Sequence, residues 1–165
     1  MSLSKAVETA IKMETDAIKF YREASGKTSH ALGKRLFESF VVDELRHLKM
    51  LQDIMNGLDI EIKFVRPKED IKTVFSELKG EMMQRISATT DEKEAVKVAL
   101  DFEKEGYNFY KKAALEAAEE KEKKLFKVLT AEEERHYKLL ENTNRFFENT
   151  GDWFMWEEHG ILEGG

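Results

Sequence analysis

The chain has 165 residues, 41% of them hydrophobic and 36% charged, and a formal net charge of -6. This length suits one domain with a buried core, and the acidic balance excludes the basic surface that binds nucleic acid. The sequence has no cysteine, which excludes disulfides and thiolate metal sites within it. The first twenty residues have no apolar signal core and no stretch reaches membrane-spanning length, so we expect a cytoplasmic protein without a membrane partner.

Apolar residues recur at alternating steps of three and four along most of the chain, which predicts four amphipathic helices. A single proline and abundant Ala, Glu, Lys and Leu favour the same all-α class. The helices are expected at residues 4–25, 31–56, 91–118 and 122–148.

Two further segments flank or connect these helices. Residues 58–90 form one long crossover, with Pro67 near its start and an apolar pattern over 70–87 that predicts a short extra helix. Residues 149–165 form a tail with Trp153, Phe154 and Trp156. Because such a tail is too apolar for a free end, we expect it to pack on the bundle or on a neighbouring subunit.

The chain also contains an internal repeat without gaps, at an offset of 89 residues. Residues 13–24 (METDAIKFYREA) align with 102–113 (FEKEGYNFYKKA), and 36–51 (LFESFVVDELRHLKML) align with 125–140 (LFKVLTAEEERHYKLL). Each half is therefore a helix hairpin. Two hairpins joined by one long crossover have ferritin-like connectivity. We predict an all-α, ferritin-like four-helix bundle over residues 1–148, built from two hairpins related by a pseudo-two-fold axis.

Charged residues interrupt the apolar seam of each helix at one level. Glu14 and Glu44 are 30 residues apart, as are their repeat partners Glu103 and Glu133. In antiparallel hairpins this spacing places all four about 20 Å from their turns, at ~1.5 Å per residue. Four carboxylates in a core repel one another and are costly to bury, so protons or cations must neutralise them.

Two histidines lie one turn beyond two of these glutamates. Glu44-x-x-His47 and Glu133-x-x-His136, with one glutamate from each other helix, match the ligand pattern of di-iron and di-manganese bundles. Oxygen-rich ligands with one imidazole per ion suit iron, or alternatively manganese, better than structural zinc. The alternative is a salt-bridge network in the core. The predicted metal ligands are Glu14, Glu44, His47, Glu103, Glu133 and His136, around two iron ions.

Several neighbouring residues have two interpretations. Tyr21 and Tyr110 either donate hydrogen bonds to the cluster or are ordinary core residues. Asp43 and Glu132 either orient the histidine of the opposite half or lie on a solvated face. Arg46 and Arg135 are expected to form surface ion pairs.

At Glu14, Glu44-x-x-His47, Glu103 and Glu133-x-x-His136 the chain resembles the rubrerythrin branch of the ferritin-like superfamily, over about residues 4–148. The resemblance implies Glu14 and Glu103 as ligands from the first and third helices, Glu44 and Glu133 as bridges, and the two histidines as terminal ligands. Tyr21 matches a tyrosine near the cluster in rubrerythrins. That family reduces hydrogen peroxide at a diferrous site, usually with electrons from a rubredoxin-like domain.

The chain departs from this family pattern at two points. Gly106 stands where rubrerythrins carry a further glutamate, and the cysteine-bound iron domain is absent from the sequence. We therefore expect a di-iron oxidoreductase acting in oxidative stress on peroxide or dioxygen, with a separate electron-donor protein and a homo-oligomeric, most simply dimeric, state. The alternatives are ferritin-like iron oxidation and storage, or a structural bundle with vestigial ligands.

Overall fold

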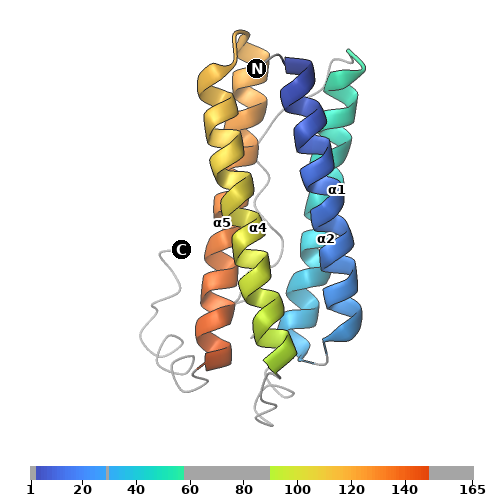
Figure 1. Ribbon diagram of the computed structural model, residues 1–165, viewed down its shortest axis with the longest axis vertical. Helices are drawn as coiled ribbons and strands as arrows, with labels where there is room; N and C mark the ends of the chain where they lie inside the picture. Colours follow the sequence, from blue (N-terminus) through green and yellow to red (C-terminus); the bar gives the residue numbers. More distant parts are fainter. Residues whose placement is uncertain (1–2, 29, 58–89, 149–165) are drawn as a thin grey trace.

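The computed structural model describes residues 3–28, 30–57 and 90–148, which form four long helices (Figure 1). The helices are α1 (Leu3–Lys27), α2 (Ala31–Met55), α4 (Thr90–Glu116) and α5 (Glu120–Glu148). Every boundary lies within two residues of the predicted one, and the predicted all-α four-helix bundle is confirmed. The extra helix expected at 70–87, the rest of the crossover and the aromatic tail at 149–165 lie outside the described residues and stay predictions.

The four helices pair as two antiparallel hairpins that lie side by side (Figure 1). α1 packs along α2, and α4 packs along α5. Because α2 and α4 run in the same direction, the end of α2 and the start of α4 lie at opposite ends of the bundle, as a single long crossover requires. A membrane-spanning helix is not found among the helices that the structure describes.

The buried core is divided into two apolar clusters. One surrounds the connection between α1 and α2 and includes Leu36, Phe37 and Phe147. The other lies toward the connection between α4 and α5 and includes Leu51 and Phe126. Along each helix the seam glutamate falls between residues of the two clusters, so the carboxylate layer separates them. The apolar packing on both sides fixes the helices that carry the carboxylates.

Helix α2 ends at Met55, and Asn56 and Gly57 form the turn that follows it. The amides of Asn56 and Gly57 donate hydrogen bonds to the carbonyls of Gln52 and Ile54. Gly57 has a φ of 74°, a left-handed conformation that glycine adopts without the steric cost of a Cβ.

The connection between α1 and α2 is tied to the second hairpin. The backbone amide of His30 donates a hydrogen bond of 3.2 Å to Oε1 of Glu92, near the start of α4. The His30 ring packs against Phe146 and Phe147 near the end of α5, at centroid distances of 5.8 and 4.7 Å. His30 and Glu92 are both buried. This contact sets how the two hairpins meet at one end of the bundle.

We predict that Glu92→Ala lowers the free energy of unfolding of the metal-free protein by about 1–3 kcal/mol, because a buried amide loses a charged acceptor. Urea unfolding measures the change. The control is Glu94→Ala, which removes an exposed carboxylate of the same helix turn and is expected to change stability by less than about 0.5 kcal/mol. Equal effects of the two substitutions would contradict a role for Glu92 in joining the hairpins.

Candidate metal centre

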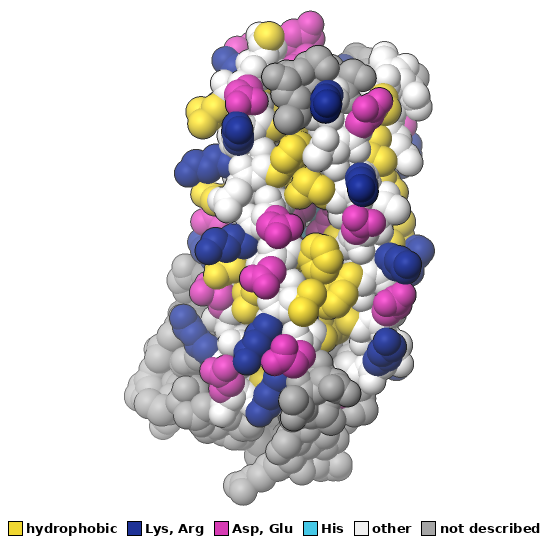
Figure 2. Space-filling view, viewed as in Figure 1, with side chains coloured by type: hydrophobic (Ala, Val, Ile, Leu, Met, Phe, Trp, Pro, Cys, Tyr) yellow, Lys and Arg dark blue, Asp and Glu magenta, His cyan; other side chains and the backbone are white. Residues whose placement is uncertain are grey.

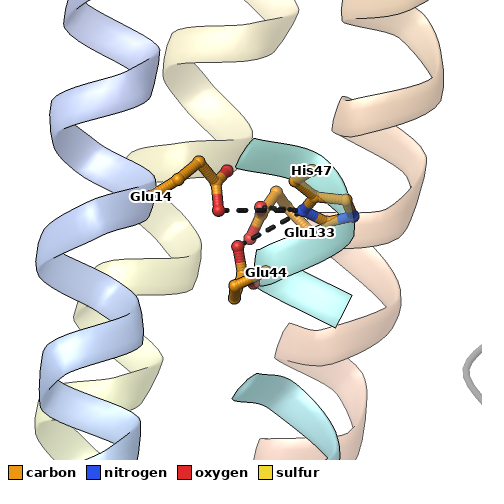
Figure 3. Close-up of side chains that lie close together, drawn as sticks. All are labelled: Glu14, Glu44, His47 and Glu133. Carbon is orange, nitrogen blue, oxygen red and sulfur yellow. Dashed lines mark hydrogen bonds and ion pairs between the residues drawn. The ribbon is translucent and has the colours of Figure 1, made fainter. Parts of the chain in front are cut away.

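The structure brings all six predicted ligands together in the middle of the bundle. They form two groups, each with potential ligand atoms within 4.8 Å of one another. One group comprises Glu14, Glu44, His47 and Glu133, and the other comprises Glu44, Glu103, Glu133 and His136. Glu44 and Glu133 belong to both groups. Figure 3 shows the first group, with side chains from α1, α2 and α5 pointing toward a common point.

Both histidines turn the same ring nitrogen toward the carboxylates. Nδ1 of His47 lies 3.3 Å from Oε2 of Glu44 and 3.5 Å from Oε1 of Glu133. Nδ1 of His136 lies 3.1 Å from Oε1 of Glu44 and 3.4 Å from Oε1 of Glu103. The two halves therefore present equivalent nitrogen atoms, as the internal repeat requires.

The other ring nitrogen of each histidine contacts an outer carboxylate from the opposite hairpin. Nε2 of His47 lies 2.8 Å from Oε1 of Glu132, and Nε2 of His136 lies 2.8 Å from Oδ2 of Asp43. All four side chains are buried. A carboxylate at Nε2 favours a proton there, so that on metal binding the neutral imidazole would offer the lone pair of Nδ1 to the ion.

Two tyrosines contact the cluster from the opposite hairpin in the same crosswise manner. The hydroxyl of Tyr21 donates a 2.5 Å hydrogen bond to Oε1 of Glu103, and that of Tyr110 donates one of 2.5 Å to Oε1 of Glu14. Burial, followed by the charge of nearby glutamates, raises the pKa of both hydroxyls well above 10. Both tyrosines thus remain protonated hydrogen-bond donors.

The buried charges shift the protonation equilibria of the inner side chains. Burial, together with the charges of Glu103 and Glu44, raises the pKa of Glu133 well above its usual value. Burial disfavours the charged form of Glu44 too, but the two nearby histidines outweigh it and lower its pKa to about 2. Burial also opposes protonation of His47 and His136, yet the surrounding carboxylates raise the pKa of each ring well above 6.5. Without metal, protons therefore supply the positive charge of the site.

The donor set fits a pair of divalent cations. Four buried oxygen or nitrogen atoms of the cluster lack a well-directed hydrogen bond: Oε2 of Glu14, Oε1 of Glu44, Oε2 of Glu103 and Nδ1 of His136. Buried polar atoms are normally satisfied, and metal coordination would satisfy these. Two divalent ions would also balance four carboxylates, which removes the repulsion between them.

A small cavity of about 110 Å³ connects the cluster with the surface between α1 and α4. Its lining consists of five pairs related by the internal repeat: Met13 and Phe102, Glu14 and Glu103, Asp16 and Glu105, Ala17 and Gly106, Glu44 and Glu133. The pseudo-two-fold axis thus passes through the cavity. Figure 2 shows acidic side chains beside a hollow in the middle of this face, with hydrophobic side chains above and below it. Asp16 and Glu105 are exposed.

The position of Arg46 differs from the sequence prediction. Instead of a surface pair, both of its terminal nitrogens donate to the buried carboxylate of Glu132, which also contacts His47. A signal existed in the sequence, because an arginine directly precedes the histidine in both copies of the repeat.

We predict that Glu133→Gln stabilises the metal-free protein at about pH 8.5, by roughly 1–3 kcal/mol, because it removes one of the mutually repelling carboxylates. A raised pKa in the folded state means that Glu133, His47 and His136 release protons on unfolding, so stability should fall as the pH rises above about 6.5. The substitution should make this fall shallower. Urea unfolding after chelator treatment, at about pH 6 and 8.5, measures both effects.

The matched control for this substitution is Glu134→Gln at the next, exposed position, which should leave the pH dependence unchanged. A loss of stability in Glu133→Gln would identify Glu133 as a structural hydrogen-bond partner in the metal-free core.

The family model for rubrerythrin matches residues 5–143, which covers most of the chain and all six clustered residues. No curated protein and no solved structure matched the chain. The rubrerythrin family implies an iron site, and the buried carboxylates and histidines fit one. The chain therefore belongs to the rubrerythrin family.

Proposed function

We propose that the protein is a di-iron carboxylate oxidoreductase that reduces hydrogen peroxide or dioxygen with electrons from a separate donor protein. The observation that carries this proposal is the pair of fused ligand groups, which share Glu44 and Glu133. Two ions held by these groups would share the carboxylates of Glu44 and Glu133, and shared carboxylates are typical of di-iron bundles. Membership of the rubrerythrin family supports iron, and the same donor types also suit manganese.

Each residue has a distinct role in this proposal. Glu44 and Glu133 would help to hold both ions, because both ligand groups contain them. Glu14 and His47 would complete the ligands of one ion, and Glu103 and His136 would complete those of the other. The outer carboxylates Glu132 and Asp43 orient the imidazoles, and Tyr21 and Tyr110 orient the terminal glutamates.

Two bound ferrous ions would supply the two electrons that, with two protons, reduce hydrogen peroxide to two molecules of water. The residues around the carboxylate layer would keep bulk water away from this reaction and limit the path by which the oxidant enters. The apolar clusters above and below exclude bulk water from the carboxylate layer. The cavity between α1 and α4 supports access by a small oxidant from one side. The carboxylates fix the geometry, and no side chain acts as a nucleophile.

The remaining parts of the proposal concern partners. The sequence has no cysteine that could hold an iron–sulfur or rubredoxin-like centre, so we propose a separate electron donor. We also propose a cytoplasmic homodimer.

A second candidate function is iron oxidation followed by storage, as in ferritins. It is favoured by the exposed carboxylates of Asp16 and Glu105 beside the cavity, which would attract ferrous ions toward the centre. Storage requires a hollow assembly of many subunits. Light scattering distinguishes the two functions, since a dimer excludes a cage.

We predict that anaerobic loading with ferrous iron gives two ions per chain, because the repeat supplies two equivalent ligand groups. Metal analysis after desalting measures the ratio. Stopped-flow mixing of the loaded protein with peroxide should then give a rise in near-ultraviolet absorbance from oxidised iron. Fewer than one ion per chain would contradict the proposed function, and would favour a bundle with vestigial ligands.

Gly106 tests whether the cavity governs the oxidant. A Cβ at this position would lie 3.4 Å from both Cδ and Oε2 of Glu133. Any side chain at position 106 would therefore contact the carboxylate of Glu133 directly. We predict that Gly106→Glu changes the rate with peroxide relative to that with dioxygen by several-fold, while the metal content stays at two ions. Stopped-flow rates with each oxidant give this ratio.

The control for this substitution is Gly26→Glu, where a Cβ meets nothing within 4 Å. Unaltered rates in metal-loaded Gly106→Glu would mean that Gly106 serves only close helix packing and that the oxidant does not pass it.

A further inference from the structure

The two halves of the metal centre differ at the outer carboxylates that contact the histidines. His47 contacts Glu132, whereas His136 contacts Asp43, at the same Nε2 to oxygen distance of 2.8 Å. These acids occupy equivalent positions of the repeat, 89 residues apart, but aspartate is shorter by one methylene group. Nε2 of each imidazole therefore lies at the same distance from its outer carboxylate. The halves differ in which arginine, if any, bonds to that carboxylate.

An arginine neutralises only one of these two carboxylates through hydrogen bonds. Arg46 donates from both terminal nitrogens to Glu132, with Nη1 3.2 Å from Oε2 and Nη2 against Oε1. This two-bond pairing is the strongest arginine–carboxylate geometry. Nη2 of the same arginine lies 3.9 Å from Oδ1 of Asp43, a longer contact without a hydrogen bond.

The equivalent arginine of the second half makes no such bond. Arg135 forms no hydrogen bond or ion pair with Asp43, and its buried Nε has no hydrogen-bond partner among the residues that the structure describes. The shorter aspartate reaches His136 but not Arg135. We attribute the difference between the two arginines to the methylene group by which Asp43 is shorter than Glu132.

We propose that Arg46 makes the two halves of the centre bind divalent cations unequally, with the His136 half binding more tightly. This inference rests on the proposed function, since it requires two cations. A carboxylate behind a metal-bound histidine increases the basicity of that histidine toward the metal. Arg46 cancels the charge of Glu132 and so weakens this effect at His47. Asp43 retains more of its charge behind His136.

Arg46 is thus a positioning and charge-balancing residue that acts through Glu132. Because the two Nε2 contacts have equal length, the length of this hydrogen bond does not distinguish the two halves, whereas the charge on the outer carboxylate does.

Zinc titration of metal-free protein labelled with ¹⁵N-histidine tests the inference, because imidazole nitrogen spectra report His47 and His136 separately. Substitution of each histidine assigns its signals, and signals of the other histidines serve as internal references. At one zinc ion per chain we expect at least fivefold higher occupancy at His136 than at His47. Arg46→Gln should reduce the ratio to within twofold, whereas Arg46→Lys, which keeps the charge, should preserve the preference.

The matched control is Arg135→Gln, which should leave the ratio unchanged because, among the described residues, Arg135 forms no hydrogen bond or ion pair with Asp43 or Glu132. A second variant, Glu132→Gln, removes the carboxylate and keeps Arg46, so it should widen the ratio and provides the test if Arg46→Gln does not fold. Equal occupancy in the unaltered protein, a preference that survives Arg46→Gln, or its loss in Arg46→Lys would overturn the inference. Two zinc ions bound with equal occupancy would leave the proposed function standing, whereas failure to bind a pair of ions would overturn both.

Discussion

The structure depends on how four carboxylates are accommodated at one level of a helical core. Glu14, Glu44, Glu103 and Glu133 are each at most 3% exposed, and each is flanked by apolar side chains along its helix. Transfer of a carboxylate into such surroundings is unfavourable unless a proton, a hydrogen bond or a cation compensates it. The histidines and tyrosines around this layer supply part of that compensation. The unsatisfied oxygens that remain define where cations would bind.

The buried carboxylates of each hairpin receive hydrogen bonds from side chains of the other hairpin, and this links the site to the packing of the two hairpins. Tyr21 of the first hairpin bonds to Glu103 of the second, and Tyr110 of the second bonds to Glu14 of the first. The contacts of His47 and His136 with the outer carboxylates also cross between hairpins. Neither hairpin can satisfy its buried charges alone. The polar layer therefore fixes the register between two hairpins that the apolar clusters alone would hold less specifically.

Much of this arrangement could be predicted from the sequence because the repeat and the helical period constrain it strongly. Equal spacing of Glu14 from Glu44 and of Glu103 from Glu133 places all four in one layer, and the structure agrees. Contacts that depend on side-chain reach could not be predicted in this way. Both arginines directly precede a histidine, yet only Arg46 bonds to an outer carboxylate, since the partner of the other is an aspartate. Periodicity predicts which face of a helix a residue lies on, but it does not predict whether its side chain reaches a partner on the opposite hairpin.

The two halves of the repeat also differ at the cavity beside the carboxylate layer. Ala17 and Gly106 are equivalent in the repeat and line the same cavity, but only the glycine lets the backbone of α4 approach Glu133 without an intervening Cβ. A glycine within a helix costs roughly 0.5–1 kcal/mol relative to alanine. This glycine lies beside Glu133, on the side of the carboxylate layer that faces the cavity. Two differences between the halves, Ala17 against Gly106 and Asp43 against Glu132, thus occur at the cavity and at the outer carboxylates.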